Sequence, residues 1–186
     1  MIKIRAKGKD IPLPKTAREL KRVGDLWVRN ARYRLDNFKP FPRKDRGTLR
    51  TSMKVVVGVE NNSPFVDVTP SVPYWNFIDQ GVKGSKSSPY RRQSESPFAF
   101  RDKMPPLSAI LPWVERKRIQ IRDKKGRYST YRSTAYVIAR SIYFKGIAPT
   151  HFITDTGEFI QNKYGEGIAK AMLDDIADSQ KKKPKN

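Results

Sequence analysis

A long amphipathic helix is the clearest pattern near the N-terminal end of this sequence. Apolar residues recur every three or four positions: Leu20, Val23, Trp27, Ala31 and Leu35. That spacing places them on one face of an α-helix. Thr16 followed by Glu19 has the form of a capping box, and Pro40 and Pro42 prevent the helix from continuing. We therefore expect a helix that begins at Thr16 and ends near Phe38.

A β-hairpin is predicted for the segment 54–69. Apolar residues occupy two stretches on either side of a turn: Val55, Val57 and Val59, then Phe65, Val66 and Val68. The turn is Asn61-Asn62-Ser63-Pro64, whose residues favour tight reversals. Tyr74–Ile78, bounded by Pro73 and Gly81, is expected to add a third strand because aromatic residues favour strands. Since a lone hairpin is not stable in water, it must pack against helices.

The rest of the chain alternates between basic loops and helices. Helices are expected at 107–119, 133–145 and 156–179, with Gly146 as the C-terminal cap of the second. The segments 82–106 and 120–132 are predicted to be long basic loops, the first of them mobile, the second with a turn at Lys125-Gly126-Arg127 between extended arms. The predicted fold class is α+β: a small antiparallel sheet packed against a long N-terminal helix and C-terminal helices.

Length and composition limit the class of protein further. The 186 residues fit one domain, predicted at 16–180, with a basic arm at 1–15 and a basic tail at 181–186. The sequence has no cysteine, which excludes disulfides and thiolate chemistry. Because no signal peptide and no apolar run of about 20 residues is visible, we expect a soluble protein with no membrane contact.

The charge is strongly positive. Lysine and arginine number 39 against 18 acidic residues, which gives a formal net charge of +21. Such a balance predicts attraction to nucleic acid, anionic protein or anionic lipid. Part of it lies on the polar back of the first helix, at Arg18, Lys21, Arg22, Arg29 and Arg32. The alternative is that most of these cations form a solvated surface, so the charge alone does not identify a partner.

Residues suited to catalysis are few. His151 is the single histidine, and a packing role beside Phe152 or a place at a loop surface is the simpler interpretation. A magnesium nuclease would need convergent carboxylates, and nothing in the sequence brings together the available candidates: Asp67, Asp79, Glu95 and Asp102, with Lys103. No metal-ligand spacing and no phosphate-binding loop is present. We expect no enzyme activity, no cofactor and no metal.

Aromatic and basic residues alternate in three places: Arg32-Tyr33-Arg34, Tyr90-Arg91-Arg92 and Arg127-Tyr128-Ser129-Thr130-Tyr131-Arg132. Such clusters could stack nucleic-acid bases between cationic contacts. No recognisable nucleic-acid-binding motif accompanies them, so binding would be nonspecific. The alternative is that the tyrosines anchor loops against a neighbouring subunit.

Three motifs in a fixed order carry a resemblance to a known family. Gly47, Leu49, Arg50 and Ser52 form a glycine-initiated turn after the first helix. An aromatic segment follows the hairpin, at Tyr74, Trp75, Phe77, Asp79 and Gly81. A helix then carries Ala135, Tyr136, Ile138, Ala139 and Ile142, followed by Gly146-Ile147, Pro149 and Phe152. In this order they resemble the tail-completion, or head-to-tail joining, proteins of tailed bacteriophages.

The resemblance implies a structural virion protein that forms a homo-oligomeric ring, often sixfold, at the neck or the top of the tail. Its partners would be the head connector or adaptor and the tail tube or tail terminator, around the channel through which DNA passes. Location in the virion, after assembly in the host cytoplasm, is implied with it. Asp79 stands where the family has glutamate, and we expect it to partner Arg50 or a loop cation.

The candidate motif and interface residues are Gly47, Leu49, Arg50, Ser52, Tyr74, Trp75, Asp79, Gly81, Arg91, Arg92, Lys124, Lys125, Arg127, Pro149 and Phe152. Gly47 is expected to permit the turn, and Leu49 to pin it to the core. The long basic loops are expected to order on assembly. The alternative function is that of a basic, nonspecific nucleic-acid-binding protein.

Overall fold

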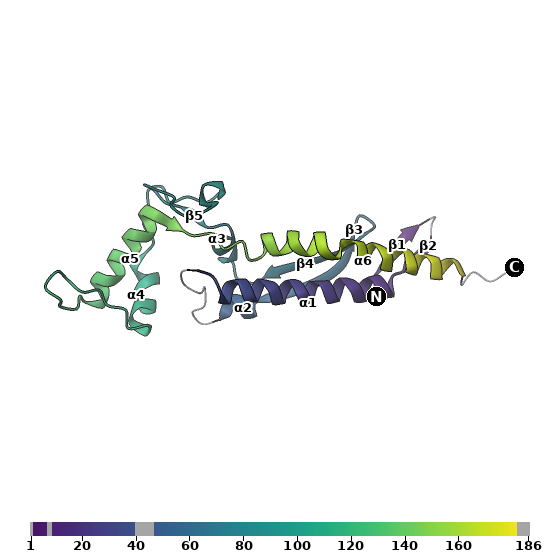
Figure 1. Cartoon of the computed structure of the whole chain (residues 1–186), viewed down its shortest axis with the longest axis horizontal. Coiled ribbons are helices and arrows are strands. Elements are labelled where there is room, and N and C mark those ends of the chain that lie inside the picture. Colours follow the sequence, from purple (N-terminus) through teal and green to yellow (C-terminus); the bar gives the residue numbers. More distant parts are fainter. Residues whose placement is uncertain (1, 7–8, 40–46, 182–186) are drawn as a thin grey trace. The chain divides into compact units, whose positions relative to one another are not determined.

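The computed structural model describes residues 2–6, 9–39 and 47–181 (Figure 1). The fold class is α+β, as predicted. The chain divides into two compact units, Met1–Trp75 with His151–Asn186, and Asn76–Thr150. The single domain predicted over 16–180 is therefore organised as two units. The second unit contains both predicted loop segments and the two helices associated with them.

The first unit is built around two long helices. The helix α1 spans Pro14–Asp36 and α6 spans Thr154–Lys181; they pack side by side (Figure 1). The apolar face predicted for α1 is confirmed, because these side chains are buried: Leu20, Val23, Ala31 and Leu35. Trp27 lies against Gly157 of α6, and its indole N–H donates to the Ile153 carbonyl at 3.2 Å. Helix pairing thus supplies much of the apolar core of this unit.

The predicted hairpin is confirmed. The strands β3 (Met53–Glu60) and β4 (Ser63–Pro70) pair antiparallel, with Glu60 opposite Ser63. Asn61 and Asn62 form the two-residue turn, with φ of 47° and 64°, as a type I′ turn requires. This ribbon packs on α1 at Gly24, where a Cβ would collide with the side chain of Val55. The close approach explains why α1 carries glycine at that position.

The predicted third strand is wrong. Trp75–Asp79 forms a short helix, α3, in which the backbone N–H of Gln80 donates to the Asn76 carbonyl at 2.9 Å. The strands instead form three separate two-stranded ribbons in the described part of the chain. Aromatic residues favour strands only where a pleated neighbour covers them. Here the Tyr74 and Phe77 side chains stay about two-fifths exposed, at 44% and 42%.

The N-terminal segment, expected to be an extended arm, folds back on itself. The strands β1 (Lys3–Ala6) and β2 (Lys9–Pro12) pair antiparallel before α1 begins. Ile4 is 5% exposed and Leu13 is fully buried. The apolar side chains of this basic segment are therefore part of the core rather than free in solvent. The tail predicted at 181–186 lies, apart from Lys181, outside the described residues.

The second unit joins α4 (Leu107–Arg116) to α5 (Tyr131–Lys145). Ile110 and Val114 of α4 pack with Ala135 and Ala139 of α5. Both helices were predicted, although α4 ends before Ile119. Pro112 lies inside α4 rather than in its first turn. Thr130 caps α5 by accepting a hydrogen bond from the Ser133 N–H at 3.2 Å.

The segment 82–106, predicted to be a loop, contains two regular pieces. The strand β5 (Val82–Lys83) pairs with β6 (Gly146–Ile147), and a 3₁₀ helix, η1, spans Gln93–Glu95. Gln93 is fully buried, and its side-chain amide donates to the carbonyls of Val82 at 2.7 Å and Lys145 at 2.8 Å. The serine-rich, basic composition of this segment predicted a loop. Composition gives no indication that the Gln93 side chain is buried and hydrogen-bonded. None of the described helices is long and apolar enough to cross a bilayer.

Candidate functional site

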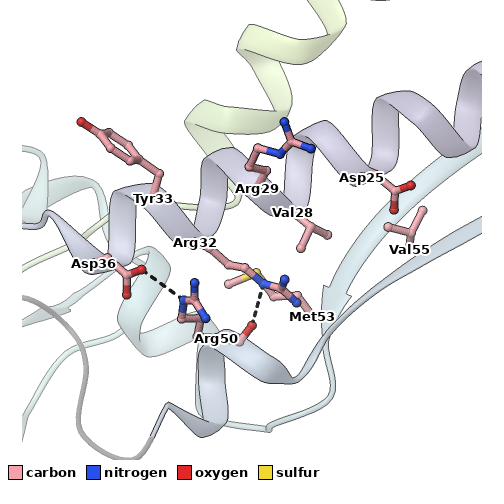
Figure 2. Close-up of a pocket in the computed structure, with 9 residues that line it drawn as sticks. All are labelled: Asp25, Val28, Arg29, Arg32, Tyr33, Asp36, Arg50, Met53 and Val55. Carbon is pink, nitrogen blue, oxygen red and sulfur yellow. Dashed lines mark hydrogen bonds and ion pairs between the residues drawn. The ribbon is translucent and has the colours of Figure 1, made fainter.

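A groove in the first unit combines an apolar floor with a charged rim (Figure 2). Its volume is about 630 Å³. The lining residues come from α1, from the one-turn helix α2 (Thr48–Thr51) and from β3. They are Asp25, Val28, Arg29, Arg32, Tyr33, Asp36, Arg50, Met53 and Val55. The groove therefore depends on the packing of the first helix against the start of the hairpin.

The turn before α2 fixes one wall of the groove. Gly47 has φ of +79°, a left-handed conformation that glycine adopts without strain. Leu49 is 7% exposed, which confirms that it anchors this turn to the core. The Ser52 hydroxyl donates to the Leu49 carbonyl at 2.8 Å. The predicted turn is thus present, with one helical turn between Gly47 and the strand.

Arg50 is held by α1 in two ways (Figure 2). Its Nε donates to Asp36 Oδ2 at 3.1 Å, and its carbonyl accepts from Arg32 Nε at 3.0 Å. The expected pairing of Arg50 with Asp79 is therefore replaced by an ion pair with Asp36. Asp79 is 1% exposed at the end of α3. The alternative partner predicted for Asp79, a loop cation, stays a prediction.

The rim of the groove carries unbalanced positive charge. Asp36 neutralises Arg50, but no described residue forms an ion pair with Arg29 or Arg32. Asp25 stands one turn before Arg29 on the same helix and makes no ion pair with a described residue. Asp36 Oδ1 is buried without a hydrogen-bond partner among the described residues. The groove thus carries two guanidinium groups, those of Arg29 and Arg32, that have no ion-pair partner among the described residues.

The floor of the groove is apolar. Val28 is 7% exposed and Met53 is 5% exposed, while Val55 is half-buried. Tyr33 lies at the rim with 67% of its surface exposed. An apolar floor with a few charged groups at its edge is a common form of protein binding site. The arrangement is suited to binding.

The groove was not predicted from the sequence, although a signal existed. Asp25, Arg29, Arg32 and Asp36 recur at spacings of three and four, which places them on one side of α1. Of these four, Arg29 and Arg32 belong to the basic polar back predicted for the helix, whereas Asp25 and Asp36 were assigned no role. Only the contact of α1 with β3, made by residues distant in sequence, turns this charged strip into one wall of a groove.

The basic loop 120–132 is organised around one carboxylate. Asp123 Oδ1 accepts from the backbone N–H of Lys125 at 2.8 Å and of Arg127 at 2.9 Å. Asp123 Oδ2 accepts from Arg127 Nε at 3.0 Å. Hydrogen bonds from the Arg127 backbone, then its side chain, and from the Lys125 backbone lower the pKa of the Asp123 carboxyl. Gly126 has φ of +77°, which confirms the predicted turn.

The tyrosine of this loop is already engaged. The Arg122 guanidinium lies 4.6 Å from the Tyr128 ring centroid, and its Nη2 donates to the Tyr128 hydroxyl at 2.6 Å. One face of the ring is therefore covered by a cation of the same loop. Lys124, Lys125 and Arg127 are exposed, as an interface role requires. Arg91 is also exposed, whereas Arg92 Nε forms an ion pair with Glu95 Oε2 at 3.3 Å.

Other candidate interface residues lie elsewhere than predicted. Phe152 is fully buried and Pro149 is buried, so both are core residues rather than parts of an exposed surface. Tyr74 is exposed, and Trp75 is half-buried at the start of α3. Gly81 has φ of +72° and a Cβ there would collide with the backbone of Ile147 and Pro149. Phe152, Pro149 and Gly81 therefore contribute to the packing of the fold.

His151 occupies a strained position ahead of α6. Its φ is +48°, unusual for a residue with a side chain. Its carbonyl accepts from the Asp155 N–H at 3.2 Å and from Arg34 Nη1 at 3.3 Å. The described residues contain no group of three histidine, aspartate or glutamate side chains that could hold a metal ion.

Comparison of the chain with protein-family models, curated proteins and solved structures gives no match.

Proposed function

We propose that the protein is a structural subunit of a ring at the neck or top of the tail of a tailed bacteriophage. The observation that carries the proposal is the order of three sequence motifs: the Gly47 turn, the aromatic segment 74–81, and the helix 135–142 that leads to Phe152. Each motif alone is short. Their order across most of the chain is what resembles the tail-completion proteins.

The structure supports the proposal by giving these motif residues positions where their chemistry is needed. Gly47 and Gly81 have positive φ, with Gly81 also packed too closely for a side chain. Ala135 and Ala139 are fully buried against α4. Phe152 is fully buried in the first unit. The motifs therefore mark the scaffold of the fold rather than a reaction centre.

A ring also needs surfaces that bind another copy head to tail. Large apolar side chains are exposed on several elements: Tyr74, Phe77, Tyr136, Val137, Phe159 and Leu173. Some of them lie close together in sequence, at Tyr136 and Val137 on α5. Such exposed side chains are available for contact with another copy. The ring would join the head connector to the tail tube or tail terminator around the DNA channel.

The direct test is electron microscopy combined with mass measurement. Purified protein, alone and mixed with connector and tail-tube proteins, should form closed rings, and antibody against it should label the neck of intact particles. Val137→Glu on the exposed face of α5 should reduce ring formation, while Gln161→Glu, an exposed position of α6 outside the candidate interface residues, changes the net charge equally and provides a control. A protein that stays monomeric in every mixture and is missing from particles would refute the proposal.

The rival function is nonspecific nucleic-acid binding, which the net charge of +21 favours. A protein that neutralises about six phosphates loses affinity steeply with salt, with a log-log slope of roughly −5. Gel shifts across a salt series separate the two functions. Tight, stoichiometric binding that survives physiological salt would favour the rival, and binding that collapses would favour the ring protein.

A further inference from the structure

We propose that the groove between α1, α2 and β3 is a docking site for an acidic segment of a different protein. The segment would present a carboxylate next to an apolar side chain. This proposal does not depend on the ring, because it rests only on the lining residues of the groove (Figure 2).

The positive rim selects for a carboxylate. Arg29 and Arg32 have no ion-pair partner among the described residues, while Arg50 is neutralised by Asp36 at 3.1 Å. Arg32 is also oriented, because its Nε donates to the Arg50 carbonyl at 3.0 Å. A guanidinium held in this way loses little conformational entropy when it binds a carboxylate. Charge-assisted hydrogen bonds to such groups are stronger than neutral ones.

The floor selects for an apolar neighbour of that carboxylate. Val28 and Met53 are nearly buried, so the hydrocarbon that the groove presents below its charged rim comes mainly from the half-buried Val55. A ligand that is charged throughout would leave this surface wet and gain nothing from it. Tyr33, exposed at the rim, adds an amphipathic side chain of the type enriched at protein interfaces.

A nucleic acid fits the same groove poorly. Asp25 and Asp36 are part of the lining, and their carboxylates repel phosphates. Asp36 Oδ2 already accepts a hydrogen bond from Arg50 Nε at 3.1 Å. A polypeptide brings backbone N–H donors together with its carboxylate, whereas a phosphate backbone offers only acceptors.

A second copy of this chain is also disfavoured. An acidic segment complements Arg29 and Arg32 better than a second chain of net charge +21 does, although copies can still meet through other, apolar faces. An acidic partner gains from the same field, which raises its rate of association. The net positive charge of the chain and the arginines at the rim of the groove therefore both favour an acidic partner.

Fluorescence anisotropy with the full-length protein tests the proposal at physiological ionic strength. The probe is a short fluorescein-labelled peptide with a repeating Glu-Leu-Ser sequence. Controls are the same peptide with Gln in place of Glu, polyglutamate of equal length, and single-stranded oligothymidylate as competitor. We expect saturable binding of the Glu-Leu-Ser probe, with both control peptides weaker by about tenfold, as one lost charge-assisted or apolar contact predicts.

Two matched variants locate the site. Arg29→Glu lies in the groove, and Arg18→Glu is an exposed residue of the same helix outside it; both change the net charge equally. Arg29→Glu should lower the affinity of the protein for the probe by about tenfold or more. Arg18→Glu should leave that affinity nearly unchanged. Arg29→Gln, which is milder for folding, should give an intermediate loss. Circular dichroism and thermal unfolding verify that each variant is folded.

Equal losses in Arg29→Glu and Arg18→Glu would overturn the proposal, because they would indicate attraction to the whole basic surface. Absence of saturable binding to the probe would overturn it as well. So would competition by oligothymidylate as strong as that by unlabelled probe, which would identify the groove as a nucleic-acid site.

Discussion

Asp175 on α6 caps the N-terminus of α1 through Thr16. Its Oδ2 accepts from both the backbone N–H and the hydroxyl of Thr16 at 2.8 Å, and its Oδ1 accepts from the Lys15 N–H at 3.1 Å. Asp175 is 3% exposed and Thr16 is fully buried. The N-terminal N–H groups of a helix lack partners within it. Here the Asp175 carboxylate, from the opposite end of the chain, is the hydrogen-bond acceptor for two of these N–H groups.

Replacing this carboxylate should destabilise the first unit. We expect Asp175→Ala to lower the free energy of unfolding by about 1–3 kcal/mol, because the cap is lost and Thr16 is left buried without its partner. Urea denaturation followed by circular dichroism measures the change. Asp174→Ala is the matched control, since Asp174 is exposed on the same helix. Equal effects of the two substitutions would contradict the capping role of Asp175.

Replacing glycine by alanine should have opposite effects on stability at two positions in the long helices, Gly24 and Gly165. A Cβ at Gly24 would collide with the Val55 and Val66 side chains, so Gly24→Ala should destabilise by about 1–3 kcal/mol. A Cβ at Gly165 meets nothing within 4 Å, so Gly165→Ala should stabilise α6 by up to about 1 kcal/mol. Thermal unfolding of the two variants should shift in opposite directions. A stabilised Gly24→Ala would mean that the ribbon does not pack closely on α1.

The Gly47 turn should be sensitive to conformation rather than to size. A Cβ there meets nothing within 4 Å, but φ is +79°. Gly47→Ala should therefore cost about 1–2 kcal/mol of stability from backbone strain. Gly47→Asn should cost less, because asparagine tolerates left-handed backbone. The comparison of their denaturation midpoints tests this; a larger loss for asparagine would show that size is what matters.

The loop around Asp123 should lose order in acid. Its pKa is lowered, chiefly by the Arg127 backbone N–H, so the hydrogen-bonded form is favoured above the ordinary aspartate pKa. That stabilisation disappears as the pH falls through the lowered pKa. In NMR spectra, the Lys125 and Arg127 amide signals should shift together, with a midpoint below the ordinary aspartate value. Asp123→Asn should abolish this titration, and a midpoint at or above the ordinary value would rule out the hydrogen-bonded loop.

Local sequence patterns were sufficient for several elements. The apolar spacing of Leu20 to Leu35 predicted α1, and the Asn61-Asn62 pair predicted the turn of the β3–β4 hairpin. Gly126 and Gly146 were predicted at a turn and a helix end, and both have positive φ. These features depend on residues close together in the chain, whose conformational preferences act directly on the neighbouring backbone.

The capping box shows where such patterns fail. Thr16 and Glu19 have the right spacing, but α1 begins at Pro14 and its N-cap residue is Leu13. Glu19 pairs with Arg22 instead, with Nε to Oε2 at 2.9 Å, and the side-chain hydrogen bond from Arg22 lowers the pKa of the Glu19 carboxyl. Similarly, the aromatic residues near Trp75 form α3 rather than a strand. In both cases a competing interaction overrode a local preference.

The sequence by itself determined where the long helices, the hairpin and the glycine turns lie, because those depend on periodicity and on backbone conformation within a few residues. Only the tertiary structure decided that Asp175 caps α1, that Phe152 is core, and that Arg29 and Arg32 line the same groove as Val28 and Met53. These relationships join residues far apart in the chain. The entropic cost of bringing such residues together is offset by the packing of whole helices and strands against one another. A local sequence pattern does not reveal that packing.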